Sequence, residues 1–153
     1  MVRFFGKATG KVDDKGRIVL PATYRDAMAR EGESDLTLVI KKSVKGDCLN
    51  LFTFKEWSSR SDKVLDGIDP ELNPEHAEFW SKFNDGLYYV VPDEKLARLN
   101  IPSELLEQTG ITKEVVFVGV GYKIEIWAKE AREALLMSDE RFKSTAIRLS
   151  EKK

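Results

Sequence analysis

The chain contains one cysteine, one histidine and no long apolar run. A single cysteine, Cys48, cannot form an intramolecular disulfide, which favours a reducing, cytoplasmic compartment. No apolar run reaches the ~18 residues that a membrane-spanning helix needs. The first residues also lack the apolar core that is typical of a signal peptide. The sequence therefore predicts a cytoplasmic protein without a membrane partner.

The same scarcity argues against an enzyme. His76 has Glu75 and Glu78 as neighbours, but glutamates on an exposed helix usually face solvent rather than a metal. Cys48 begins a predicted strand, and a chain with one histidine gives little support for a Cys–His nucleophile. The run Gly119-Val120-Gly121 lies between two predicted strands, where a hairpin turn is expected rather than a phosphate loop. We therefore predict no catalytic residue, no metal, no cofactor and no small-molecule substrate.

The net charge of −1 hides an uneven distribution along the 153 residues, a length suited to one compact domain or two small fused ones. Residues 1–25 hold six bases and two acids, whereas residues 62–94 hold nine acids and two bases. Such a molecule can turn a basic face toward a polyanion and keep its acidic region away from it. The bases of the first segment are Arg3, Lys7, Lys11, Lys15, Arg17 and Arg25.

One pattern occurs twice in the chain. In Asp13-Asp14-Lys15-Gly16-Arg17-Ile18-Val19-Leu20-Pro21, an acid lies four residues before an arginine and a proline lies four residues after it. Glu94-Lys95-Leu96-Ala97-Arg98-Leu99-Asn100-Ile101-Pro102 repeats this spacing 81 residues further along. Each copy is followed by a short helical pattern, an apolar β-rich run and an alternating strand. A repeat of this length indicates two copies of one structural unit.

A strand, a short helix and a hairpin do not make a stable domain alone, because their edges stay unpaired. Two copies can cover each other's edges and close a small β-barrel, as a pseudo-dimer within one chain. We predict a mostly β fold with helices (α+β), with a polar helical segment at about 128–149. The predicted parts are a first repeat at 1–57, a helical connector at 58–85, a second repeat at 86–130 and a C-terminal helical tail at 131–153.

Arg17 is the strongest candidate for a functional residue, because it follows a tight turn and begins a strand that would hold it rigidly. A guanidinium group can bind a phosphate or a guanine edge through two hydrogen bonds. Lys15 lies at the tip of the turn, where it suits a phosphate, and Gly16 supplies the positive φ that the turn needs. Phosphate would repel Asp13, so its expected role is to pair with Arg17 or to cap the turn and orient the arginine.

Lys7 and Lys11 lie on the extended segment before the turn, and Arg3 lies at its start. We predict that all three bind DNA together with Lys15 and Arg17. The alternative is that the lysines form an ordinary solvated face and that Asp13 and Arg17 form only a local ion pair. The duplicated spacing of acid and arginine favours the functional interpretation.

The second copy carries weaker signals. Glu94, Leu96 and Ala97 stand where the first copy has aspartate, lysine and glycine. Arg98 is therefore a weaker candidate for DNA binding, with Glu94 as its orienting acid. A structural ion pair between Glu94 and Arg98 is the favoured interpretation.

These residues resemble the MraZ family of bacterial transcriptional regulators, whose members carry two repeats of the SpoVT-AbrB type. The similarity extends over about residues 3–135. In the first half, Asp13-Asp14-Lys15-Gly16-Arg17 followed by Pro21-Ala22-Thr23-Tyr24-Arg25 carries it. In the second half it runs from Leu105 to Gly110 and on to Lys123-Ile124-Glu125-Ile126-Trp127. A match in two parts is more specific than the short turn motif alone.

The resemblance implies two tandem AbrB-like repeats that form a swapped-hairpin β-barrel. It implies a ring homo-oligomer of roughly eight to twelve subunits, in the cytoplasm and at the nucleoid. The implied partner is double-stranded DNA with short direct repeats, upstream of a division and cell-wall gene cluster that family members usually repress. The family's acid-to-arginine motif falls on Asp13 and Arg17, and its second occurrence on Glu94 and Arg98.

Two other classes of function stay open. An AbrB-like antitoxin or dimeric DNA-binding module typically has one repeat and a disordered toxin-binding tail, whereas this chain has two fused repeats and a helical C-terminal segment. A protein-interaction scaffold that does not bind nucleic acid is the second class. The molar mass in solution separates a ring from a dimer, and the response to DNA separates a regulator from a scaffold.

Overall fold

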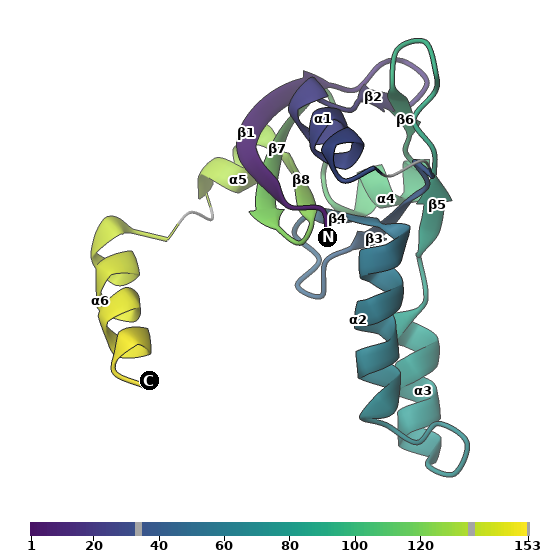
Figure 1. Ribbon diagram of the computed structural model, residues 1–153, viewed down its shortest axis with the longest axis vertical. Helices are drawn as coiled ribbons and strands as arrows, with labels where there is room; N and C mark the ends of the chain where they lie inside the picture. Colours follow the sequence, from purple (N-terminus) through teal and green to yellow (C-terminus); the bar gives the residue numbers. More distant parts are fainter. Residues whose placement is uncertain (33–34, 135–136, 153) are drawn as a thin grey trace.

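The computed structural model describes residues 1–32, 35–134 and 137–152 (Figure 1). These residues form a mixed α+β fold, as the repeat pattern predicts. Its strands are β1 (Phe4–Lys11), β2 (Arg17–Val19), β3 (Leu38–Lys42), β4 (Leu49–Thr53), β5 (Tyr88–Val90), β6 (Arg98–Asn100), β7 (Glu114–Gly121) and β8 (Ile124–Ala128). Its helices are α1 (Ala22–Arg30), α2 (Phe54–Asp66), α3 (Pro74–Phe83), α4 (Ser103–Gln108), α5 (Lys129–Ala134) and α6 (Asp139–Ser150).

Local signals in the sequence determine where several helices begin. The Asn73 side chain accepts hydrogen bonds from two backbone N–H groups of the first turn of α3, and Pro74 occupies the first helical position, as predicted. Thr53 caps α2 by accepting from the backbone N–H of Glu56, which is why this helix begins before the expected connector at 58–85. Ser138 caps α6 in the same way. The predicted helical segment at 128–149 thus contains α5 and α6, and its residues 135–136 lie outside the described residues.

The two repeats exchange strands in a symmetric manner. β1 pairs with β7 and β5 pairs with β3, so the first strand of each repeat joins the third strand of the other. β2 pairs with β6, and β4 pairs with β8, each with its counterpart. All these pairings are antiparallel, and each repeat supplies edges that the other covers.

The resulting sheets are a six-stranded sheet in the order β1-β7-β8-β4-β3-β5 and a two-stranded sheet of β2 and β6. In the pairings of the described residues, β1 and β5 are the outer strands of the larger sheet. Closure of the two sheets into one barrel therefore stays a prediction. We refer to the smaller sheet as the β2–β6 ribbon.

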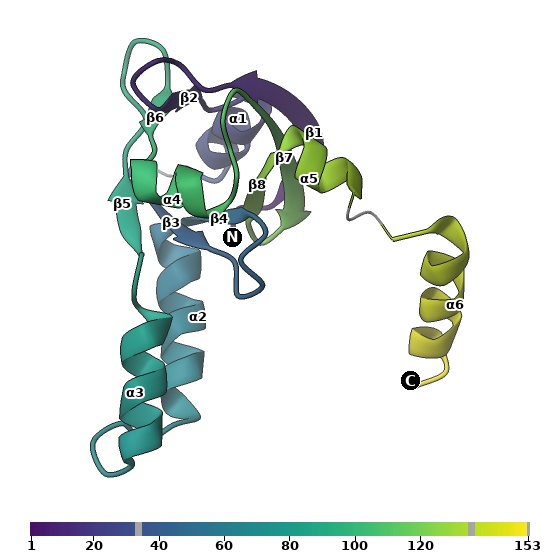
Figure 2. The ribbon, with the colours of Figure 1, turned by 180° about the vertical axis from the view of Figure 1, so that it is seen from behind.

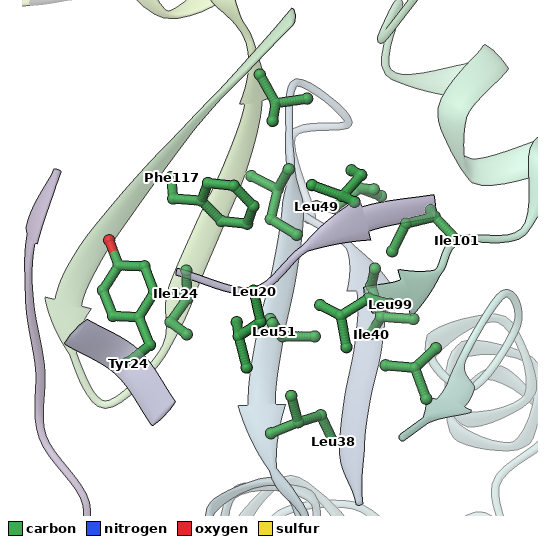
Figure 3. Close-up of a cluster of buried hydrophobic side chains, with 14 of the residues drawn as sticks. Leu20, Tyr24, Leu38, Ile40, Leu49, Leu51, Leu99, Ile101, Phe117 and Ile124 are labelled. Carbon is green, nitrogen blue, oxygen red and sulfur yellow. The ribbon is translucent and has the colours of Figure 1, made fainter. Parts of the chain in front are cut away.

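The hydrophobic core lies between the ribbon and the larger sheet (Figure 3). Ile18 of β2 and Leu99 of β6 are fully buried, and both repeats contribute equivalent side chains around them. The buried side chains drawn in Figure 3 include Leu20, Tyr24, Leu38, Ile40, Leu49, Leu51, Leu99, Ile101, Phe117 and Ile124. Because both repeats fill one core, neither can keep its ribbon strand in place alone.

The helices α2 and α3 form a hairpin that projects from the sheets, opposite the end where the ribbon lies (Figure 1). Three aromatic pairs centred on Phe83 stack between and within these helices, with centroid distances of 5.6–5.8 Å to Trp57, Phe79 and Trp80. The helix α6 stands apart from the sheets in both views (Figures 1 and 2). Among the described residues, no helix has the length and apolar character needed to cross a bilayer.

Gly119 lies where two backbones approach closely. The predicted hairpin turn at Gly119-Val120-Gly121 is wrong in position, because these residues end β7, and Tyr122 and Lys123 make the turn to β8. Gly119 opposes Gly6 in the β1–β7 pairing. A Cβ atom at Gly119 would lie 2.7 Å from backbone atoms of both Phe4 and Phe5. Only glycine leaves room for β1 at this position.

We expect Gly119→Ala to lower the free energy of unfolding by about 1–3 kcal/mol, because backbone atoms of β1 must move to admit the methyl group. The same substitution at Gly67 is the control, since its nearest contact would be an ordinary 3.6 Å, and it should change stability by only about 0.5 kcal/mol. Urea unfolding at one fixed protein concentration measures both. Equal losses in the two variants would contradict the close approach of β1 to β7.

Candidate nucleic-acid interface

The β2–β6 ribbon presents one buried face and one outer face. Its register pairs Arg17 with Asn100, Ile18 with Leu99 and Val19 with Arg98. Successive side chains of a strand point to opposite faces, and directly opposed residues share a face. Since Ile18 and Leu99 are buried, the outer face carries the remaining four side chains, which are Arg17, Val19, Arg98 and Asn100.

The first turn holds Arg17 through the carboxylate of Asp13. Asp13 Oδ1 accepts hydrogen bonds from the backbone N–H groups of Lys15 (2.9 Å) and Arg17 (2.8 Å). Asp13 Oδ2 accepts from Arg17 Nε at 2.8 Å. Gly16 has a φ of +77°, which closes the turn. Asp13 thus fulfils both roles that the sequence left open, because it caps the turn and pairs with the arginine.

The second turn holds Arg98 in the same way, but through Asp93. Asp93 Oδ2 accepts from Arg98 Nε at 2.7 Å and from the backbone N–H of Arg98 at 3.1 Å. Asp93 Oδ1 accepts from the backbone N–H of Leu96 at 2.7 Å. The prediction that Glu94 orients Arg98 is therefore wrong. This turn is one residue longer than the first, so the acid lies five residues before its arginine.

Ala97 occupies in the second turn the place of Gly16. Its φ is +54°, and in the described part of the chain no other non-glycine residue has a positive φ. The left-handed conformation costs an L-residue roughly 1–2 kcal/mol, so the surrounding structure must enforce it. The backbone N–H of Ala97 donates to Asp93 O at 2.9 Å, and its carbonyl accepts from Leu20 N at 2.8 Å. One bond within the turn and one across the ribbon therefore hold the turn without a glycine.

Both aspartates stay ionised well below neutral pH. Hydrogen bonds from the backbone N–H of Leu96 and from the Arg98 side chain lower the pKa of Asp93 from 3.8 to about 2. The backbone N–H of Arg17 is the largest of the causes that lower the pKa of Asp13. In each pair the aspartate binds Nε of the arginine. Among the described residues, the terminal guanidinium nitrogens have no hydrogen-bond partner, and they are available to an external acceptor.

The other basic candidates lie at increasing distances from the first turn. Lys15 is exposed at its tip, and Lys11 ends β1 just before it, opposite Glu114 of β7. Lys7 lies four residues back on the same face of β1, roughly 13 Å away at the rise of a strand. Arg3 precedes β1 and lies roughly 25 Å from Lys11. The structure does not bring Arg3 together with Arg17, because the whole length of β1 separates them.

The other reactive residues have structural surroundings. His76 Nδ1 accepts from the backbone N–H of Asp69 at 2.9 Å and thereby holds the loop before α3. Burial raises the pKa of the Cys48 thiol to about 12, which keeps it protonated and unreactive. Within the described ranges, no group of three or more histidine, cysteine, aspartate or glutamate side chains is arranged to hold a metal ion.

Sequence reasoning missed three residues of this site. Asp93 could have been found by aligning the extended segments that precede the two turns. It comes two residues after Val91, just as Asp13 comes two residues after Lys11. Val19 and Asn100 alternate with the buried Ile18 and Leu99, which is a period-two signal for an outer face. Their position beside the arginines depends on the pairing between repeats.

Several known proteins are similar to this chain. A family described as "MraZ protein, putative antitoxin-like" matches residues 86–150. A protein of Bacteroides fragilis named "Transcriptional regulator MraZ" is 35% identical over 142 residues, which are 93% of this chain and 87% of that protein. Proteins with the same name from Bacteroides thetaiotaomicron and Dictyoglomus thermophilum are 33% and 34% identical. They cover 93% and 85% of this chain, and 88% and 82% of their own lengths.

We expect Asp93→Asn to lower the midpoint of thermal unfolding at neutral pH, whereas Glu94→Gln leaves it nearly unchanged. Because Asp93 has a folded pKa of about 2 against 3.8 for a free carboxyl, its ionised form stabilises the fold above that unfolded value. This stabilisation is lost as the pH falls toward the folded value. The difference between the wild type and Asp93→Asn should therefore disappear in acid. A larger loss in Glu94→Gln would restore the pairing predicted from the sequence.

Proposed function

The chain belongs to the MraZ family of transcriptional regulators, and from that premise we propose that it binds double-stranded DNA through the outer face of the β2–β6 ribbon. One observation carries this proposal. Two arginines, each held by an aspartate, share the outer face of a two-stranded ribbon at the end of the molecule opposite the α2–α3 hairpin (Figure 1).

The shape and chemistry of the ribbon suit the major groove. That groove is about 12 Å wide and admits a two-stranded β-ribbon. We assign base or phosphate contacts to Arg17 and phosphate contacts to Lys15 and Lys11, with Lys7 further along the DNA backbone. Arg98 is a weaker contact, because Leu96 replaces the lysine at the tip of its turn. Arg3 has no place in this interface.

The low net charge of the ribbon predicts that a single copy of the chain binds DNA weakly. Asp13 and Asp93 offset much of the charge of their arginines, and Asp14 and Glu94 lie in the same turns. The acidic helix α3 lies far from the ribbon, where it does not repel DNA (Figure 2). Several linked copies would raise the affinity by roughly 10²–10⁴ through effective concentration. A weak single contact therefore suits an oligomer that binds several DNA repeats at once.

We further propose a ring homo-oligomer of roughly eight to twelve subunits that binds short direct repeats. Exposed apolar side chains on the parts that project from the sheets support association. Phe142 and Leu149 of α6 and Leu72 before α3 are largely exposed. The target that the family resemblance suggests is the region upstream of the division and cell-wall gene cluster. Repression of that cluster, at the nucleoid in the cytoplasm, completes the proposed function.

An antitoxin-like dimeric DNA-binding module is the second candidate. The words "antitoxin-like" in the description of the matching family favour it. The two fused repeats and α6 distinguish this chain from a single repeat with a disordered tail. An interaction scaffold without DNA binding has no comparable support, because it leaves the paired arginines of the outer face without a role.

Arg17→Ala should reduce binding to the DNA upstream of the protein's own operon to the level of unrelated DNA, since each specific contact contributes about 1–3 kcal/mol. Arg30→Ala removes the same charge from an exposed position outside the ribbon and should bind normally. For the wild type, about eight neutralised phosphates predict a slope of roughly −7 in log K against log salt. Gel-shift titrations measure both quantities. Normal binding by Arg17→Ala, or a flat salt response, would reject the proposed interface.

The molar mass in solution tests the ring. Light scattering after size exclusion should give about eight to twelve times the chain mass of 17.4 kDa. Arg17→Ala should give the same mass as the wild type, because the ribbon is assigned to DNA and not to assembly. A mass of two chains would favour the antitoxin-like dimer.

A further inference from the structure

The two ends of the β2–β6 ribbon carry different chemistry. At one end, Arg17 opposes Asn100, and Lys15 precedes the strand. We call Lys15, Arg17 and Asn100 the polar end. At the other end, Arg98 opposes Val19, and Leu96 precedes the strand; we call Leu96, Arg98 and Val19 the apolar end.

The equivalence of these positions follows from the hydrogen bonds. The ribbon has an approximate twofold axis at the Ile18–Leu99 pair, which relates the two arginines to each other. The same axis relates Val19 to Asn100. The backbone N–H groups of Lys15 and Leu96 each donate to Oδ1 of the aspartate in their own turn, so these two positions also correspond. The arginine is kept at both ends, whereas Lys15 and Asn100 of the polar end correspond to the apolar residues Leu96 and Val19.

The side-chain chemistry of Asn100 is not used by the fold. This residue is exposed, and within the described part of the chain its side chain makes no hydrogen bond. Asparagine is also depleted in strands, where a β-branched residue such as Val19 is preferred. The free amide at the end of β6 therefore has no evident structural role.

The chemistry of the asparagine side chain matches a base edge. The asparagine side chain can donate an N–H to N7 of adenine while its Oδ1 accepts from the N6 amino group, a pair of hydrogen bonds that valine cannot make. Valine can only contact the methyl group of a thymine. Directly opposed side chains have Cβ atoms about 4.5–5.5 Å apart, a spacing that lets Arg17 and Asn100 reach neighbouring base pairs.

We propose that Asn100 determines specificity by binding an adenine beside the base pair that Arg17 contacts, and that the ribbon therefore recognises an asymmetric DNA sequence. The inference rests on the proposed DNA binding and deepens it. Two identical ends would bind the two halves of a palindrome equally. A polar and an apolar end instead give each chain a direction along the DNA, so successive copies bind repeats that point the same way.

Selection from a library of randomised DNA duplexes tests the proposed role of Asn100 with three proteins. The wild type should enrich an asymmetric motif in which an A·T pair adjoins a G·C pair. Asn100→Val makes the two ends more alike, and it should lose the preference at the A·T position while keeping the G·C pair. Its affinity for the wild-type motif should fall roughly 5- to 150-fold. Val19→Asn is the converse variant, and it should enrich a second A·T pair at the position related by the twofold axis.

The controls separate this inference from the proposed function. Asn100→Val should keep the unfolding midpoint, the affinity for unrelated DNA and the salt slope of the wild type. If Asn100→Val does not fold, Asn100→Ser is measured in its place. An unchanged motif and affinity in a folded Asn100 variant would overturn the inference. The proposed DNA interface would still stand if binding continues to require Arg17. If the wild type enriches no motif but still binds DNA with the expected salt slope and needs Arg17, the inference alone fails. If it does not bind DNA, the proposed function fails as well.

Discussion

The pairing of strands between the two repeats is the constraint on which the rest of the structure depends. β1 and β5 each find their partner in the other repeat, and β2 and β6 find each other. A repeat of this size exposes too many edges to be stable alone. Exchange covers these edges and unites the inner faces in one core. The outer face of the ribbon exists only because both copies are present in the same chain.

Two short turns determine how the arginines are held on the outer face of the ribbon. Each aspartate accepts hydrogen bonds from its turn and from the arginine that follows. Such fixed arginines lose less side-chain entropy on binding than free ones. The ion pairs also lower the net charge of the face, which weakens its electrostatic attraction for a polyanion. In the proposed oligomer, several linked copies would offset that loss of affinity.

Duplication preserved the fold more strictly than the chemistry. Ala97 keeps the left-handed conformation of Gly16, and Asp93 keeps the bonds of Asp13. Lys15 and Asn100, in contrast, have apolar counterparts at the other end. The core positions face both repeats and tolerate little change, whereas the outer positions are free to differ. The approximate symmetry is therefore a property of the backbone, and the surface it carries has a direction.

The sequence by itself determined the features that depend on near neighbours: the duplicated unit, the Asp13–Arg17 pair, the Asn73 cap and the α+β class. Only the tertiary structure decided that β1 separates Arg3 from the turn and that Asn100 lies opposite Arg17. A turn or a cap is fixed by hydrogen bonds over three to five residues. The register of β2 against β6 joins positions about 80 residues apart in the chain, and it is set by the packing of Ile18 and Leu99 in the shared core.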